Sequence, residues 1–310
     1  MLSPDPKYIF RGNMSCVHCV LFSINPNAEH LYAGTIKGNV HIWNLNTNRE
    51  LCQIPSGKES CLSLLCMNND LFVQHKCGLI KAYKNTGSQW ILNKSIDTNF
   101  YHYCRFQSLS EHEVLVPLEE STVGILSTNT FNIGLKLKCS GNEDLGEAMV
   151  IKPLRNERLV LVGYERGTVI LWDIRQSRVL SSLKLESCPM ALDFDNNVMK
   201  GVIGSPSDNI QTFSLSDNSL FVNNKIPLTN PGISVITIRP DAKIMAAGGW
   251  DSRVRIFSWK NLKPLAVLDQ HRETVQDICF SLARTRTYDN KYLMATAAKD
   301  GYVALWDIYN

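Results

Sequence analysis

The most constraining feature of the sequence is its last stretch, Met294–Ile308, which reads MATAAKDGYVALWDI. An apolar run ends in small residues, the turn Lys299-Asp300-Gly301 follows, and a second apolar run ends at Trp306-Asp307. Because glycine accepts a positive φ without steric cost, Asp-Gly between two β-rich runs is a strong hairpin signal. We therefore predict two antiparallel strands joined by a tight turn.

The same pattern recurs along the chain, and we distinguish seven copies of it. Each copy is predicted to end its third strand in an aromatic residue, although the third copy has an isoleucine there. The predicted ends are Trp43, Tyr83, Ile125, Trp172, Phe213, Phe257 and Trp306. The shortest interval, from Trp43 to Tyr83, is 40 residues and the longest, from Phe257 to Trp306, is 49 residues. These intervals are close to the repeat of about 40–45 residues that propeller blades show.

The repeat predicts the fold class. The dipeptide Trp-Asp closes the predicted third strand at Trp172-Asp173 and Trp306-Asp307, where it marks WD40 blades. No segment with helical periodicity is left over, so residues 1–310 are predicted to form one all-β, seven-bladed WD40 β-propeller. The longest interval contains Leu282–Asn290, which we interpret as a surface loop.

Ring closure requires a further strand. Only Tyr309 and Asn310 follow Ile308, which is too short for a fourth strand in the last blade. A strand-like segment, residues 7–11, precedes the first copy. Since an unpaired sheet edge is a liability, we predict that residues 7–11 form the outer strand of the seventh blade and close the ring.

The last copy also contains four residues suited to a buried hydrogen-bonded set. They are His271, Thr296, Asp300 and Trp306. Imidazole, hydroxyl, carboxylate and indole groups can satisfy one another inside a blade, where unpaired polar groups are costly. His271 and Asp300 also resemble part of a catalytic triad, but the structural interpretation is favoured because WD blades use this arrangement for rigidity.

Composition argues against several classes of partner. With 32 basic and 29 acidic residues the net charge is only +3, which gives no argument for nucleic acid. No apolar run has the roughly 18 residues of a membrane span, and the N-terminus lacks the features of a secretory signal. The ten cysteines follow no regular framework and are interpreted as reduced thiols of an intracellular protein.

Sequence signals for catalysis, cofactors and metals are weak. Cys16-Val17-His18-Cys19 has the spacing of a metal or redox pair, but a zinc site needs about four ligands and no second pair exists. Phosphate-binding, dinucleotide-binding, nucleophile-elbow and metalloprotease motifs are absent. We therefore expect no enzyme activity, no cofactor and no metal.

A rigid disc whose loops carry function is the remaining possibility. The predicted turn of the sixth copy places Trp250 just before two arginines, and Trp and Arg are enriched in interface hot spots. The alternative is that Trp250 packs flat on its own blade. The candidate protein-binding residues are Trp250, Arg253, Arg255, Asn230, Tyr164 and Arg166.

Several segments resemble one family closely. They are Asp5-Pro6 with Tyr8–Gly12, Leu228–Ile233 (LTNPGI), Thr237–Asp241 (TIRPD), Gly249–Phe257 (GWDSRVRIF) with Trp259, and Pro264–Leu268 (PLAVL). Together they resemble the guanine nucleotide-binding protein beta-subunit-like WD-repeat family, whose fungal counterpart is the ASTRA-associated protein. The similarity covers essentially the whole chain and is weakest from about residue 52 to residue 140.

The resemblance implies a non-catalytic adaptor of the cytoplasm and nucleus. That family works with the Tel–Tti co-chaperone assembly (TTT) in maturing and stabilising phosphatidylinositol-3-kinase-related kinases, and its fungal member is associated with a chromatin-linked complex. No G-protein γ subunit is expected as a partner, because the first blade starts almost at once and leaves no room for the helix that would pair with it. The chain on its own is expected to be a monomer.

A second hypothesis belongs to a different class. A WD40 substrate receptor would read a short or modified peptide through the central channel. This hypothesis predicts a basic or aromatic channel mouth and micromolar binding of isolated peptides.

Overall fold

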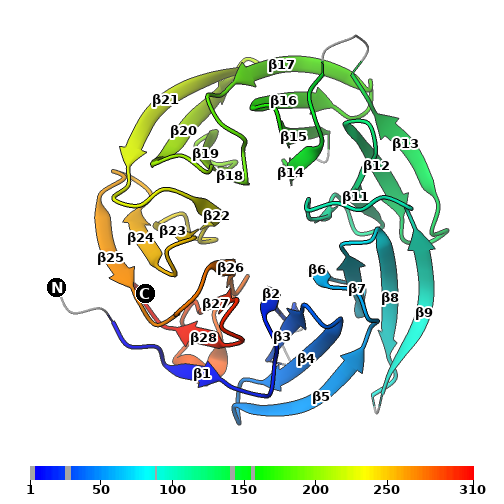
Figure 1. The fold of residues 1–310 in the computed structure, drawn as a ribbon, viewed down its shortest axis with the longest axis vertical. Helices are drawn as coiled ribbons and strands as arrows, with labels where there is room; N and C mark the ends of the chain where they lie inside the picture. The colour runs from blue at the N-terminus through cyan, green and yellow to red at the C-terminus, as the bar shows by residue number, and fades with distance from the viewer. Residues whose placement is uncertain (1–3, 25–28, 88, 140–143, 155–157) are drawn as a thin grey trace.

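The fold was analysed in a computed structural model that describes residues 4–24, 29–87, 89–139, 144–154 and 158–310. Seven four-stranded antiparallel sheets are arranged around a central axis, and the coloured ribbon passes once around the ring (Figure 1). The prediction of an all-β, seven-bladed propeller is therefore confirmed. The described residues contain no apolar helix of the length that a bilayer crossing requires.

The first three blades follow one another along the chain, each with its innermost strand first. Their strands are β2 (Val17–Phe22), β3 (His30–Thr35), β4 (Asn39–Asn44) and β5 (Arg49–Pro55) in blade 1; β6 (Cys61–Met67), β7 (Asp70–His75), β8 (Leu79–Asn85) and β9 (Trp90–Asp97) in blade 2; and β10 (Gln107–Ser108), β11 (Glu113–Leu118), β12 (Thr122–Ser127) and β13 (Ile133–Leu137) in blade 3.

Blades 4 to 6 repeat this order, and blade 7 draws on both ends of the chain. Their strands are β14 (Ala148–Pro153), β15 (Leu159–Tyr164), β16 (Thr168–Asp173) and β17 (Arg178–Lys184) in blade 4; β18 (Ala191–Asp195), β19 (Lys200–Gly204), β20 (Asn209–Ser216) and β21 (Ser219–Pro227) in blade 5; β22 (Ile233–Ile238), β23 (Ile244–Gly249), β24 (Val254–Ser258) and β25 (Pro264–Leu268) in blade 6; and β26 (Val275–Phe280), β27 (Met294–Ala298), β28 (Val303–Trp306) and β1 (Tyr8–Phe10) in blade 7.

The middle strands of each blade are the most apolar because neighbouring blades cover both of their faces. All residues of β15 and β16 are buried, whereas most residues of the outer strand β17 are not. Successive side chains of a strand therefore pack against different neighbouring blades. Val160 and Val162 face blade 3, whereas Leu159 and Leu161 face blade 5. The blade-to-blade interfaces together form the hydrophobic core.

Blade 3 departs from the predicted register by one residue. In blade 4, Trp172 pairs with Val160, and the equivalent pair in blade 3 is Val114 with Leu126. Leu126, one residue beyond Ile125, therefore lies at the aromatic position. Phe131 packs into the same cluster and stacks on Phe72 with ring centroids 6.2 Å apart, so an aromatic ring from the following turn supplies the missing apolar volume.

The N-terminal strand closes the ring, as predicted. Strand β1 pairs antiparallel with β28, and the backbone N–H of Lys7 extends the ladder by donating to the Leu305 carbonyl at 2.7 Å. Phe10 is fully buried and packs against Trp43 of blade 1, with ring centroids 5.1 Å apart. Strand β1 is thus hydrogen-bonded into blade 7, as Figure 1 shows, and its Phe10 side chain packs against blade 1.

The interpreted surface loop Leu282–Asn290 adds a second connection between the same two blades. It contains a 3₁₀ turn, η1 (Arg286–Tyr288). The backbone N–H groups of Arg286 and Thr287 in this turn donate to the Glu29 carboxylate at 2.7 and 3.3 Å. The Tyr288 hydroxyl also donates to the Asn48 side chain at 3.0 Å. The loop is exposed over much of its length, but it also joins blade 7 to blade 1.

A buried arginine fixes the last residues of the chain. Arg239 is 1% exposed and makes two hydrogen bonds to the Asp241 carboxylate, at 2.8 and 3.0 Å. Its remaining N–H groups donate to the carbonyl oxygens of Ile308 and Tyr309 at 2.9 and 2.8 Å. Arg239 thereby attaches the segment that follows β28 to blade 6.

Candidate protein interaction site

The four residues predicted as a set in blade 7 form one hydrogen-bonded chain. The Trp306 indole donates to the Thr296 hydroxyl at 3.0 Å, and that hydroxyl lies 2.8 Å from His271 Nε2. His271 Nδ1 is 3.0 Å from the Asp300 carboxylate. Burial opposes the ionisation of Asp300, but the bond to His271 and two backbone N–H groups outweigh it and lower the pKa of this carboxyl.

This set lacks the access that a catalytic triad needs. The Thr296 hydroxyl is the nucleophile that a triad would require, yet Thr296 is fully buried and its oxygen contacts both His271 and Trp306. No substrate atom can reach it without opening the blade. The arrangement instead connects the loop before β26 to β27 and β28, which stiffens blade 7.

Blade 6 uses a different polar set at the corresponding turn. The Asp251 carboxylate accepts hydrogen bonds from Arg255, at 3.1 and 2.6 Å, and from the Asn230 amide at 2.8 Å. Burial raises the pKa of Asp251, but these bonds outweigh it and lower the pKa overall. Arg255 is only 7% exposed. Arg255 and Asn230 thus stabilise the turn, and the prediction that Arg255 faces a partner is corrected.

Trp250 and Arg253 are the exposed members of this turn. Trp250 is 46% exposed, and one face of its ring covers Gly232, where an added Cβ would lie only 2.3 Å from the indole. Gly232 has φ of +92°, so the close approach and the backbone both require glycine. Trp250 therefore packs on its own blade with one face and presents the other to solvent.

The two candidate residues of blade 4 have different positions. Tyr164 is fully buried against Trp172, and burial raises the pKa of its hydroxyl, so the prediction that it lies on the binding surface is wrong. It occupies the end of β15, where both faces of the strand are covered. Arg166 is exposed and pairs with Asp144 in blade 4, and blade 5 lies between this blade and blade 6, which carries Trp250 (Figure 1).

The channel mouth contains residues that the sequence reasoning missed. A cavity of about 980 Å³ extends along the inner strands and is lined at the mouth by Ile36, Lys76, Tyr103, Trp250 and Lys299, among others. Four of them are the first residue after the second strand of their blade. These residues could have been found in the sequence from that shared position in the repeat, because equivalent positions in a propeller lie at equivalent places on the ring.

Deeper in the same cavity the cations are paired. Arg105 forms an ion pair with Asp277 and donates to the carbonyls of His18 and Gln276 at 2.7 and 2.9 Å. Lys152 forms an ion pair with Asp193. Arg105 thus connects the start of blade 3 to blades 1 and 7, and the paired cations add little net charge to the channel interior.

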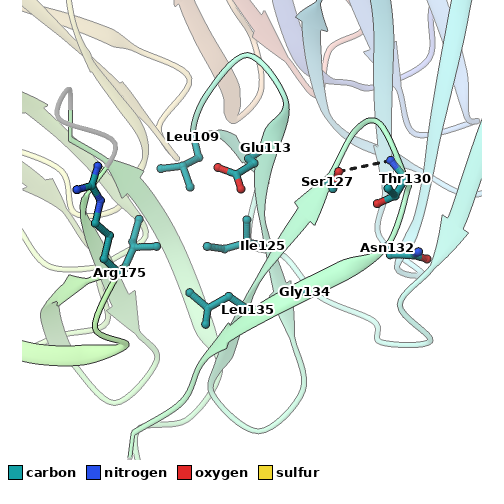
Figure 2. Close-up of a pocket in the computed structure, with 10 residues that line it drawn as sticks. Leu109, Glu113, Ile125, Ser127, Thr130, Asn132, Gly134, Leu135 and Arg175 are labelled. Atoms are coloured by element: carbon teal, nitrogen blue, oxygen red, sulfur yellow. Dashed lines mark hydrogen bonds between the residues drawn. The ribbon is translucent and has the colours of Figure 1, made fainter.

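A further hollow lies between blades 3 and 4 (Figure 2). It has a volume of about 480 Å³, with Leu109, Ile125 and Leu135 on its apolar side and Glu113 and Arg175 among its polar residues. None of the predicted binding residues lines it. The described residues also contain no group of three or more His, Cys, Asp or Glu side chains placed to hold a metal, and all ten cysteines are free.

Two buried histidines should make the free energy of unfolding depend on pH. Burial and the nearby Lys76, Arg105 and Lys299 lower the pKa of His18 to about 4, and burial lowers that of His102 to about 4. The unfolded chain, with a pKa near 6.5, binds more protons between these values. The free energy of unfolding should therefore fall as pH drops from about 6.5 to 4.5, by about 1–2 kcal/mol per histidine after allowance for solvent access.

Denaturant titrations at several pH values would measure this effect. The His18→Gln, His102→Gln double variant should show a flatter pH dependence over that interval. An identical slope in the variant and the unaltered chain would contradict the assignment of the effect to these two residues.

Comparison with known proteins places the fold in a class and the chain in a family. Residues 227–258 and 262–307 match the family model described as WD domain, G-beta repeat. These repeats and the seven sheets define a WD40 β-propeller.

The similarity to individual proteins extends over the full chain. Guanine nucleotide-binding protein subunit beta-like protein 1 of Mus musculus is 32% identical over 99% of this chain and 97% of its own length. ASTRA-associated protein 1 of Schizosaccharomyces pombe is 23% identical, with 100% of both chains covered, and that of Verticillium alfalfae is 22% identical over 99% of this chain and 93% of its own. The chain belongs to the guanine nucleotide-binding protein subunit beta-like family of WD-repeat proteins, which confirms the resemblance.

Proposed function

We propose that the chain is a non-catalytic scaffold that supports the maturation and stability of phosphatidylinositol-3-kinase-related kinases together with the TTT co-chaperone assembly. The observation that carries the proposal is the full-length relationship to the beta-like protein and to ASTRA-associated protein 1. The proposed scaffold acts in the cytoplasm and nucleus, is a monomer on its own, and binds neither nucleic acid nor a G-protein γ subunit.

The proposed contact with the co-chaperone or kinase is the exposed pair Trp250 and Arg253. Trp250 is rigid because it rests on Gly232, so little side-chain entropy is lost when a partner covers its free face. Arg253 extends the same turn beyond the buried Asp251–Arg255 ion pair. An aromatic anchor next to an arginine on a stiff turn has the composition of an interface hot spot.

Substituting Trp250→Ala together with Arg253→Glu should reduce co-purification of TTT subunits and kinases by about tenfold or more, since hot-spot truncations cost about 2 kcal/mol or more. The measurement is affinity purification of the tagged full chain with quantitative mass spectrometry. The thermal unfolding midpoint should change little because Arg253 is exposed and Trp250 is partly so.

A matched control is available on the outer strands. Phe221→Ala with Arg178→Glu also removes an exposed aromatic ring and reverses an exposed arginine, on β21 and β17. This control should recover the partners normally. Unchanged recovery with the Trp250/Arg253 variant, or equal losses with both variants, would contradict the proposed contact.

One observation favours a second candidate function, a receptor that reads a peptide at the central channel. The mouth of the roughly 980 Å³ cavity is both basic and aromatic, with Lys76, Lys299, Tyr103 and Trp250 among its lining residues. Such a mouth is what the receptor hypothesis predicts. Binding of isolated peptides is the property that separates this candidate from a scaffold that recognises only folded partners.

A further inference from the structure

The first residue after the second strand lies at an equivalent place in every blade, and we call these seven residues the rim; four of them line the channel mouth, and the rim is divided by charge. In chain order the rim residues are Ile36, Lys76, Glu119, Glu165, Ser205, Trp250 and Lys299. Blades 6, 7, 1 and 2 are consecutive in the ring and contribute Trp250, Lys299, Ile36 and Lys76. Blades 3 and 4 contribute glutamates.

The glutamate half is a genuine cluster of like charges. The Glu165 carboxylate accepts a hydrogen bond from the Glu147 backbone N–H at 3.4 Å, and burial together with the nearby Glu165 and Glu119 raises the pKa of Glu147. The three carboxyl groups therefore lie close enough to interact, and they make this side of the mouth repel anions.

The opposite half is short of negative charge. Burial lowers the pKa of Lys76, and the nearby cations Lys299 and Arg105 lower it further, although the Cys16 thiol acts in the opposite direction. Its ammonium group lies 5.2 Å from the centroid of the exposed Tyr103 ring. Lys299 has no ion-pair partner within the described part of the chain.

The remaining charges near these lysines do not neutralise them. Asp300 is already bonded to His271, and Asp277 is bonded to Arg105. Among the described residues that line the cavity, Glu273 is the carboxylate that forms no ion pair. Two lysines against one glutamate leave a net positive half-rim.

The same half-rim also exposes apolar surface. Ile36 is 43% exposed, Trp250 is 46% exposed and Tyr103 is 59% exposed. Around the ring from blade 6 to blade 2 the rim therefore alternates between an apolar residue and a lysine. A ligand that matches it needs apolar groups and negative charges in alternation.

We propose that the half-rim Trp250–Lys299–Ile36–Lys76 binds an extended peptide segment in which acidic and apolar residues alternate at every second position, so that both kinds of side chain lie on the face that meets the rim. The carboxylates contact Lys299 and Lys76, the apolar side chains contact Trp250 and Ile36, and the glutamates of blades 3 and 4 keep the segment on the basic half. This inference rests on the second candidate function and names the chemical class of its ligand.

The test is fluorescence anisotropy with the full chain and a fluorescein-labelled ten-residue peptide in which Glu and Leu alternate at every second position, with Ser between them. We expect micromolar binding that weakens as salt rises, because the lysines are solvent-accessible. Replacing every Glu of the peptide by Gln should weaken binding by about tenfold or more. The Lys76→Glu, Lys299→Glu variant should lose binding to a similar extent.

The control variant is Lys260→Glu with Lys263→Glu, which makes the same change of charge in the turn after β24, on the opposite face of the disc. It should bind the acidic peptide normally. Circular dichroism of both variants checks the fold, and the Gln peptide tests the charge requirement on the unaltered chain if the Lys76/Lys299 variant does not fold.

The outcomes separate this inference from the functions on which it builds. Equal binding of the Glu and Gln peptides would overturn the acidic ligand while leaving a peptide receptor intact. Equal loss in the two variants would overturn the half-rim as the site. Absence of binding by either peptide would overturn both the inference and the receptor candidate, but not the scaffold, which the Trp250/Arg253 co-purification tests separately.

Discussion

Deleting residues 1–12 should leave the chain largely unfolded at 25 °C. The deletion removes β1, exposes the edge of β28 and removes Phe10, which is fully buried against Trp43. The loss of a buried Phe side chain alone costs about 3–5 kcal/mol, which is comparable to the whole stability of many domains. Circular dichroism and size-exclusion chromatography of the truncated chain would measure the loss of structure.

Two milder variants serve as controls for the deletion. Removing residues 1–6 keeps Lys7 and β1, so the thermal midpoint should change little. Tyr8→Ala should cost less than Phe10→Ala, because Tyr8 is 38% exposed and Phe10 is buried. If the chain that lacks residues 1–12 melts at the same temperature as the full chain, closure by β1 does not hold the ring together.

Replacing Arg239 by Ala should cost about 3–5 kcal/mol of unfolding free energy. The change leaves the Asp241 carboxylate and the carbonyls of Ile308 and Tyr309 without their donor. Removal of one partner from a buried ion pair is costly because the other charge stays behind. Denaturant unfolding with a linear extrapolation would measure the difference.

The matched control for Arg239 is Arg284→Ala. Both guanidinium groups lie over the Tyr292 ring, at 5.7 and 5.5 Å, but Arg284 is exposed. Its loss should cost no more than about 1 kcal/mol. Arg239→Lys should fall between the two because it keeps the charge but loses the paired hydrogen bonds. Equal costs for Arg239→Ala and Arg284→Ala would contradict the role assigned to Arg239.

The fold could be predicted from local signals because a tight turn and a large apolar residue at the end of the third strand recur from blade to blade. Asp300-Gly301 and the aromatic residue Trp306 lie within seven consecutive residues, so no long-range information is needed to recognise them. The register of blade 3 was missed because Ile125 and Leu126 are both apolar. The bulge between Gly124 and Leu126 and the compensating Phe131 become visible only in three dimensions.

The candidate site was predicted only in part because residue type does not reveal side-chain direction. Trp250 and Arg253 are exposed, but Arg255 turns inward to Asp251 and Tyr164 lies between two blades. The sequence does place Asp251 four positions before Arg255, and this carboxylate is the ion-pair partner of Arg255 in the structure. Tyr164 could have been recognised as buried from the apolar run of β15 that it ends.

The contacts that span the ring could not be predicted. Arg105 contacts the backbone of His18 and Gln276, which are 87 and 171 residues away in sequence. Arg239 contacts Ile308 across 69 residues. Such pairs leave no periodic pattern, because their geometry depends on how the blades close rather than on any one blade.

The most direct test of the central claim is the steady-state level of phosphatidylinositol-3-kinase-related kinases after this protein is depleted from cells. A scaffold for their maturation predicts that the kinase proteins decline while their mRNA levels stay constant. The unaltered chain should restore them, and the Trp250→Ala, Arg253→Glu chain, expressed at the same level, should not. Unchanged kinase levels after depletion would contradict the account.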